Sequence, residues 1–82
     1  MTAGFNQQQV KSRTALLLFL KGMAAPLVLY FENPIEVYEE FQNILKSGIT
    51  KLIEKETIGP IKKLTVISSQ ISAVALQEEQ FI

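Results

Sequence analysis

The sequence predicts an α+β domain of order ββαβββ, in which one amphipathic helix packs on one face of an antiparallel sheet. Residues 33–48 carry helix-capping signals around an apolar stripe at helical spacing. The segments on either side are short and rich in apolar and branched residues, as strands are, and turn-forming residues separate them. A helix lying across an antiparallel sheet is the economical packing for this order.

The helix is expected over residues 34–46. Asn33 occupies the N-cap, Pro34 the first helical position and Glu36 the third, a close variant of the capping box. Gly48 supplies the left-handed residue that ends the helix. The stripe expected to face the sheet consists of Val37, Tyr38, Phe41, Ile44 and Leu45.

A β-hairpin is expected before the helix, with strands over residues 14–21 and 27–32 and a short loop between them. Alternation in the second strand separates Leu27, Leu29 and Phe31 from Val28 and Tyr30. The same stretch also resembles a membrane span or a signal peptide. Lys21 lies in the middle of it, Gly22 and Pro26 interrupt it, and no convincing cleavage site follows. Strands, with no membrane insertion, are therefore the preferred interpretation.

Three more strands are expected after the helix. They cover residues 50–57, 61–68 and 71–78, with a turn at 58–60, a kink at 68–70 and a bulge between 71 and 74. Lysines and glutamates mark the exposed face of the first two. Residues 1–13 are expected to form a flexible polar tail, and residues 14–82 a single domain.

Composition restricts the function. The chain has 82 residues, no cysteine, no histidine, and eight Lys and Arg against eight Glu. Disulfides and thiolate metal sites are excluded, and so is the commonest general base. A domain this small has a limited core, so a partner subunit is the support that remains for it.

No catalytic, cofactor-binding or metal-binding residues are predicted. The serines have no histidine partner, and a pairing of Ser69 with Lys62 or Lys63 would require a buried lysine. The glycines are scattered and form no phosphate-binding loop. A cluster of carboxylates from Glu36, Glu39 and Glu40 would lie on the exposed side of the helix, where water gives no support for acid–base catalysis. The chain is therefore expected not to be an enzyme.

Two binding functions remain. The first is a non-enzymatic interaction or accessory module that associates with itself or with another protein, because the apolar content of residues 14–31 exceeds what one helix face can cover. Both strands of that region could instead be buried on both sides. The second is a nucleic-acid-binding module, whose candidate face is Lys51, Lys55, Lys62 and Lys63. The zero net charge and the nearby Glu54 and Glu56 weaken it.

One stretch resembles a known family. Tyr38, Gly48, Glu54, Lys63 and the run from Ser69 to Val74 are similar to a small uncharacterised family of cyanobacterial proteins, mainly over residues 37–77. The resemblance implies a cytoplasmic protein of a photosynthetic bacterium. It supplies no activity and no site residues.

Overall fold

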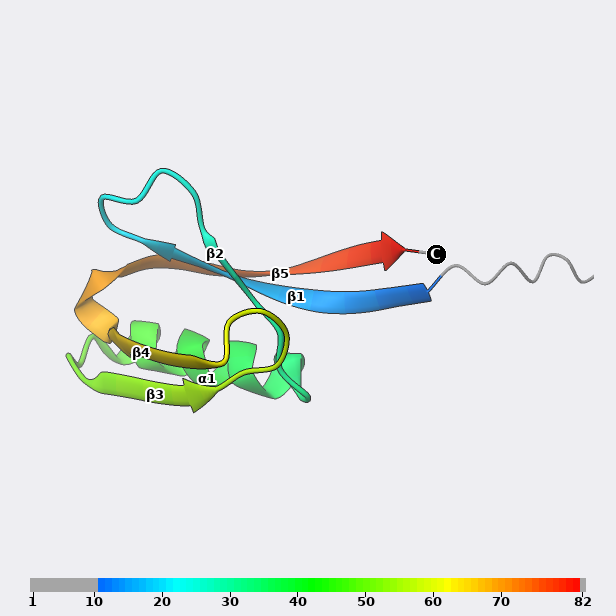
Figure 1. The fold of residues 1–82 in the computed structure, drawn as a ribbon. Coiled ribbons are helices and arrows are strands. Elements are labelled where there is room, and N and C mark those ends of the chain that lie inside the picture. The colour runs from blue at the N-terminus through cyan, green and yellow to red at the C-terminus, as the bar shows by residue number, and fades with distance from the viewer. Residues whose placement is uncertain (1–10, 82) are drawn as a thin grey trace, which may run out of the picture.

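The computed structural model describes residues 11–81 and confirms an α+β fold of order ββαβββ. The elements are β1 (Lys11–Leu20), β2 (Leu27–Leu29), α1 (Pro34–Ser47), β3 (Leu52–Glu56), β4 (Lys63–Ile67), a 3₁₀ turn (Ser68–Gln70) and β5 (Ile71–Phe81) (Figure 1). All strand pairs are antiparallel. They form a three-stranded sheet of order β2-β1-β5 and a separate β3-β4 hairpin, joined by one bridge between Tyr30 and Ile58.

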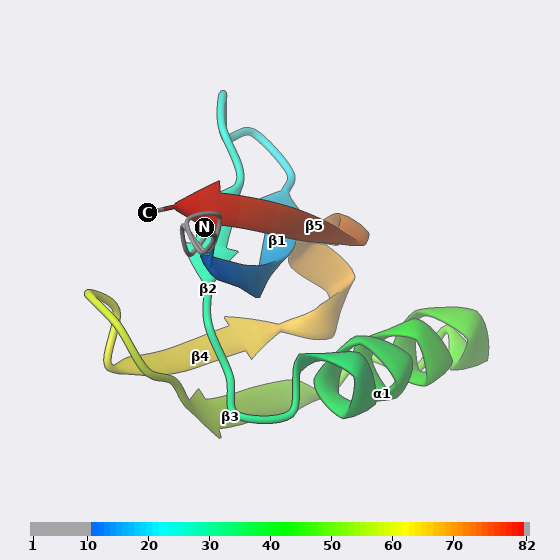
Figure 2. The same cartoon turned by 90° about the vertical axis from the view of Figure 1, so that its right-hand side faces the viewer.

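The core lies between the three-stranded sheet on one side and α1 with the β3-β4 hairpin on the other. Both views place the helix and the hairpin on the same side of that sheet (Figures 1 and 2). Leu16, Leu18 and Leu29 are fully buried there, packed with Phe41 of α1 and Ile53 of β3. The alternation of β1 explains this arrangement, because every second leucine points to the same face.

The predicted helix is confirmed, and its apolar stripe packs against the core as expected. Gly48 ends it in the left-handed conformation, with φ of 72°, and its N–H bonds the carbonyl of Leu45 at 3.3 Å. The capping prediction for Asn33 is only half right. Its backbone oxygen accepts a bond from Val37, but no side-chain cap forms within the described residues. The ψ of 73° at Asn33 departs from the extended conformation that capping side chains use.

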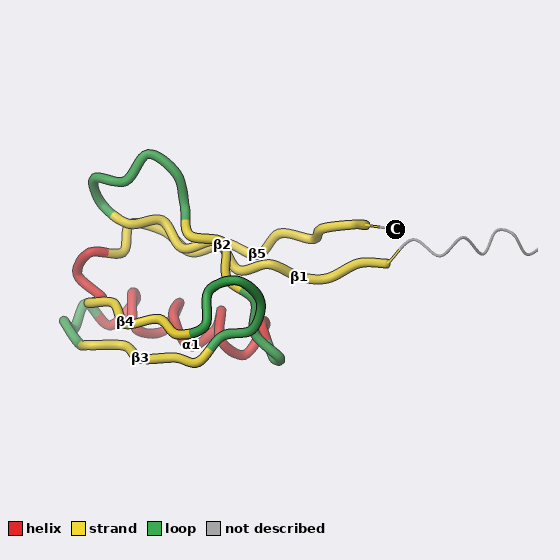
Figure 3. The backbone as a smooth tube through the Cα atoms, in the orientation of Figure 1, coloured by secondary structure: helices red, strands yellow, loops and turns green. Residues whose placement is uncertain are grey.

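The first and last strands are longer than the sequence pattern indicated. Residues 11–13 pair with residues 79–81, so β1 begins three residues before the predicted start and β5 continues beyond residue 78. The paired ends extend past the helix and the hairpin (Figure 3). Residues 1–10 of the predicted tail lie outside the described residues.

The predicted irregularities near residue 70 are confirmed. Residues 68–70 form the 3₁₀ turn that leads from β4 into β5. The register of β1 with β5 then shifts between Phe19, opposite Ala73, and Leu20, opposite Ile71, so that Ser72 is the extra residue. Within residues 11–81 no helix is long and apolar enough to cross a membrane, and β1 accounts for most of the apolar run that resembled a span.

Candidate interaction surfaces

The three-stranded sheet has a second apolar face, turned away from the core. Leu17 of β1 lies directly opposite Val28 of β2 and Ala75 of β5, and Phe19 lies opposite Ala73. Directly opposed residues of antiparallel strands share a face. Leu17, Phe19, Val28, Ala73 and Ala75 therefore form one surface, here called the outer face.

The outer face accounts for the surplus of apolar residues in the sequence. Leu16, Leu18 and Leu20 of β1 pack into the core, which leaves Leu17 and Phe19 on the other side. β1 is the central strand, but β2 is an edge strand and its Val28 is 37% exposed. The hairpin before the helix is thus not buried on both sides throughout.

One long edge of the same sheet is open. β5 pairs with β1 along one side, and no strand of residues 11–81 pairs with the other side. Its residues from Ile71 to Gln77 include no charge and no proline. Natural proteins usually protect such edges with lysines, prolines or bulges, because unpaired N–H and C=O groups invite another strand. The protective devices in this strand are the bulge at Ser72 near its start and the charges of Glu78 and Glu79 near its end, which leave residues 73–77 between them.

A second apolar patch lies on the hairpin. Leu52 and Ile67 are directly opposed on the face turned away from the core and are 57% and 44% exposed. Ile49, in the loop before β3, is 63% exposed. These three residues, the hairpin patch, lie beside the charged outer positions of the same strands, whereas the outer face spans three strands.

A polar cluster closes one end of the outer face. The register places Arg13 opposite Glu79, and Arg13 Nε donates to Glu79 Oε1 at 3.1 Å. The Tyr30 hydroxyl donates to the same oxygen at 2.9 Å, and Arg13 Nη2 lies 3.1 Å from that hydroxyl. The guanidinium also lies over the Tyr30 ring, 4.0 Å from its centroid. Three strand segments, remote in sequence, are thereby joined.

The electrostatics of this cluster favour a structural role. The hydrogen bond to Glu79, with burial, raises the pKa of Tyr30 above its usual 10.0. The hydrogen bond from Tyr30, with Arg13, lowers the pKa of Glu79 below its usual 4.5. At neutral pH the phenol is therefore protonated and the carboxylate ionised. A protonated phenol is a hydrogen-bond donor and a poor nucleophile.

Acid is expected to weaken the fold through this cluster. Because the pKa of Glu79 is lowered on folding, its contribution is present above pH 4.5 and is lost as the pH falls through the folded-state value. The loss in free energy of unfolding caused by Glu79→Gln should be greatest near neutral pH and should shrink in acid. Urea titrations at several pH values measure this difference. Tyr30→Phe should reduce the pH dependence as well, and parallel curves for the wild type and Glu79→Gln would contradict the expectation.

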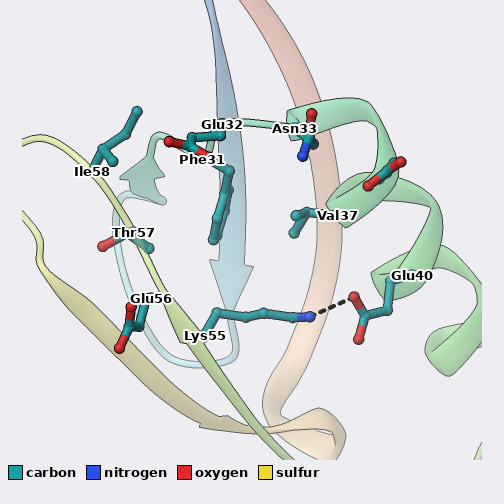
Figure 4. Close-up of a pocket in the computed structure, with 10 residues that line it drawn as sticks. Phe31, Glu32, Asn33, Val37, Glu40, Lys55, Glu56, Thr57 and Ile58 are labelled. Carbon is teal, nitrogen blue, oxygen red and sulfur yellow. Dashed lines mark hydrogen bonds and ion pairs between the residues drawn. The ribbon is translucent and has the colours of Figure 1, made fainter.

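An acidic depression of about 420 Å³ lies between the start of α1 and the end of β3 (Figure 4). Its charged lining residues are Glu32, Glu36, Glu40, Glu56 and Lys55. Lys55 Nζ donates to Glu40 Oε1 at 2.5 Å across the depression. Glu39, the third helix glutamate considered from the sequence, does not line it. Within residues 11–81 no group of three or more His, Cys, Asp or Glu side chains is arranged to hold a metal ion.

The structure does not bring the four candidate lysines onto one face. Lys55 turns to the inner side of the hairpin, where Glu40 holds it. Lys63 lies opposite Glu56 on the outer side, and Lys51 precedes β3 at the far end of the hairpin from Lys62. The sequence does contain a signal for this position: residues two apart in a strand share a face, and Ile53, two residues before Lys55, is buried. Lys55 therefore lies on the inner face of β3.

The candidate pairing of Ser69 with a lysine is also separated in space. Ser69 is exposed on the 3₁₀ turn after β4, whereas Lys62 and Lys63 lie at the opposite end of that strand. A five-residue strand spans about 17 Å at about 3.4 Å per residue, which is far beyond hydrogen-bond range. The described residues therefore bring no base to Ser69 from these two lysines.

Comparisons with known proteins add no identity. No family model matches the chain, and neither a curated protein nor a solved structure matches it. The function is therefore inferred from the surfaces themselves.

Proposed function

We propose that this chain is a small non-enzymatic interaction module that associates with a second copy of itself. The observation that supports it best is the row of apolar side chains across the outer face, from Val28 through Leu17 to Ala75. This row reaches the open edge of β5. An exposed apolar patch on a small domain is a feature of protein–protein interaction sites.

Size and charge support a second copy as the partner. An 82-residue chain has a limited core and, without cysteine, no disulfide to reinforce it. Contact with a second copy at the β5 end of the outer face would bury additional apolar area there. The net charge of zero also means that two copies carry no overall charge repulsion that would oppose association.

The alternative, a nucleic-acid-binding module, has less support. Such binding depends on lysines that line one surface and neutralise successive phosphates. The candidate lysines are divided between two sides of the hairpin, and Lys55 is paired with Glu40.

A cytoplasmic location in a cyanobacterium also belongs to the proposal, through the family resemblance alone.

Self-association is expected to appear as a concentration-dependent dimer. Sedimentation equilibrium from micromolar to millimolar protein should show conversion of monomer to dimer. High salt should not dissociate the dimer, because salt screens charge pairs but does not weaken apolar contacts. A chain that stays monomeric at millimolar concentration would contradict the proposed function.

A further inference from the structure

We infer that the two copies associate by antiparallel pairing of β5 with β5, about a twofold axis that passes beside Ala75. The inference rests on the proposed function and names the surface through which the second copy binds. It would produce one continuous six-stranded sheet from two three-stranded sheets. Strand addition of this kind satisfies backbone N–H and C=O groups that an open edge leaves unpaired.

Among the open edges, β5 is the best suited. It is 11 residues long, whereas β3 and β4 have five residues each and β2 has three. The edge of β4 is also protected, because Lys62 and Lys63 open it and Pro60 precedes them. Pairing of β5 with β4 of another copy would be head-to-tail and would produce rings or filaments instead of a dimer.

The glutamates of β5 restrict the register. A twofold axis normal to the sheet keeps the outer faces of both copies on the same side. The residue at the axis must then lie opposite the same residue of the second copy. An axis at Glu78 would oppose two like charges. An axis at Ala75 pairs residues 73–77 of the two copies, between the bulge at Ser72 and the glutamates. Glu78 and Glu79 of one copy then lie at the opposite end of the paired segment from those of the other copy.

This register also matches the apolar side chains on both faces. On the core side, half-buried Val74 would face Leu76 of the second copy, and both already pack against the core cluster. On the outer face, Ala75 would face Ala75. The row of Val28, Leu17 and Ala75 would then continue into the same row of the second copy, which doubles the outer face.

Charge substitution at Ala75 tests the register directly. In Ala75→Lys two ammonium groups would face each other across the axis, and in Ala75→Glu two carboxylates. Each variant alone should dimerise at least about tenfold more weakly than the wild type, since directly opposed like charges are destabilising. An equimolar mixture of the two variants should recover a dimer, because the opposed charges then attract. Sedimentation equilibrium measures all three samples.

Two further variants serve as controls. Ala73→Lys, on the same face, would lie opposite Gln77 of the second copy and should keep the dissociation constant within about threefold of the wild type. Ala75→Cys introduces the only thiol of the chain. It should form a disulfide-linked dimer under mild oxidation, whereas Leu52→Cys in the hairpin patch should not, because a disulfide requires Cβ atoms within about 4.5 Å.

The outcomes separate the inference from the proposed function. If the wild type is monomeric at all concentrations, the proposed function itself is wrong. If the wild type dimerises but both charge variants do so equally well, or their mixture gives no recovery, the β5 pairing is wrong and self-association remains. Preferential cross-linking at Leu52, or rings in place of dimers, would likewise overturn the pairing. Recovery in the mixture also shows that both variants fold.

Discussion

Replacing Phe41 by alanine is expected to lower the free energy of unfolding by about 3–5 kcal/mol, because it removes the largest fully buried side chain of the core. Phe41 is 1% exposed and is the residue of α1 that packs deepest against the sheet and the hairpin. A chain of this length has a total stability of about 4–12 kcal/mol. The substitution therefore removes a large part of the free energy of unfolding, and urea or thermal unfolding measures the loss.

A matched substitution on the same helix separates burial from helix propensity. Ile35 is 60% exposed in the first turn of α1, so Ile35→Ala should change the stability by less than about 0.5 kcal/mol. Both variants must be compared at one protein concentration, since association stabilises the folded state by mass action. Equal losses for the two would show that the packing at Phe41 contributes little.

The helix could be predicted because its signals are local. Pro34 and Gly48 mark its ends within the segment itself, and an apolar stripe at helical spacing needs no knowledge of the partner element. Even here one detail failed. The conformation of Asn33 depends on how the chain leaves β2, which the capping pattern does not contain.

The lengths of the outer strands could not be predicted, for a complementary reason. The residues from Lys11 to Arg13 are polar and show no alternation, so nothing local distinguishes them from a tail. Pairing with residues 79–81 makes them part of β1. The cluster of Arg13, Tyr30 and Glu79 is missed in the same way, because its members meet only when β1, β5 and the segment after β2 are aligned.

The sequence indicated a surplus of apolar surface but not which elements would carry it. An excess of apolar residues between positions 14 and 31 indicated an uncovered surface, and the structure identifies it as the outer face. The sequence could not show that β5 would be an edge, since strand order follows from the complete topology. The sequence also could not show that the four candidate lysines would be separated, with Lys55 turned toward the helix and Lys51 and Lys62 at opposite ends of the hairpin.

Ser68 shows how a residue typical of turns can become part of the interior. From sequence it is a turn residue between two strands, and it does open the 3₁₀ turn. In the structure its side chain is 4% exposed. The hydroxyl accepts a hydrogen bond from the Lys51 N–H at 2.8 Å and donates one to the Ile49 carbonyl at 2.9 Å. It therefore fixes the loop between α1 and β3 to the turn between β4 and β5.

Replacing Ser68 by alanine is expected to cost about 1–3 kcal/mol of unfolding free energy, because it leaves the Lys51 N–H and the Ile49 carbonyl without their partner. Ser72→Ala is the matched control: its exposed hydroxyl makes one hydrogen bond, to the Phe19 carbonyl at 3.1 Å, and its loss should cost less than about 1 kcal/mol. Amide hydrogen exchange distinguishes a local from a global effect. In Ser68→Ala the protection of Lys51 should fall more than that of Leu18, and equal losses at both would show that the hydroxyl acts through the whole fold and not through this loop.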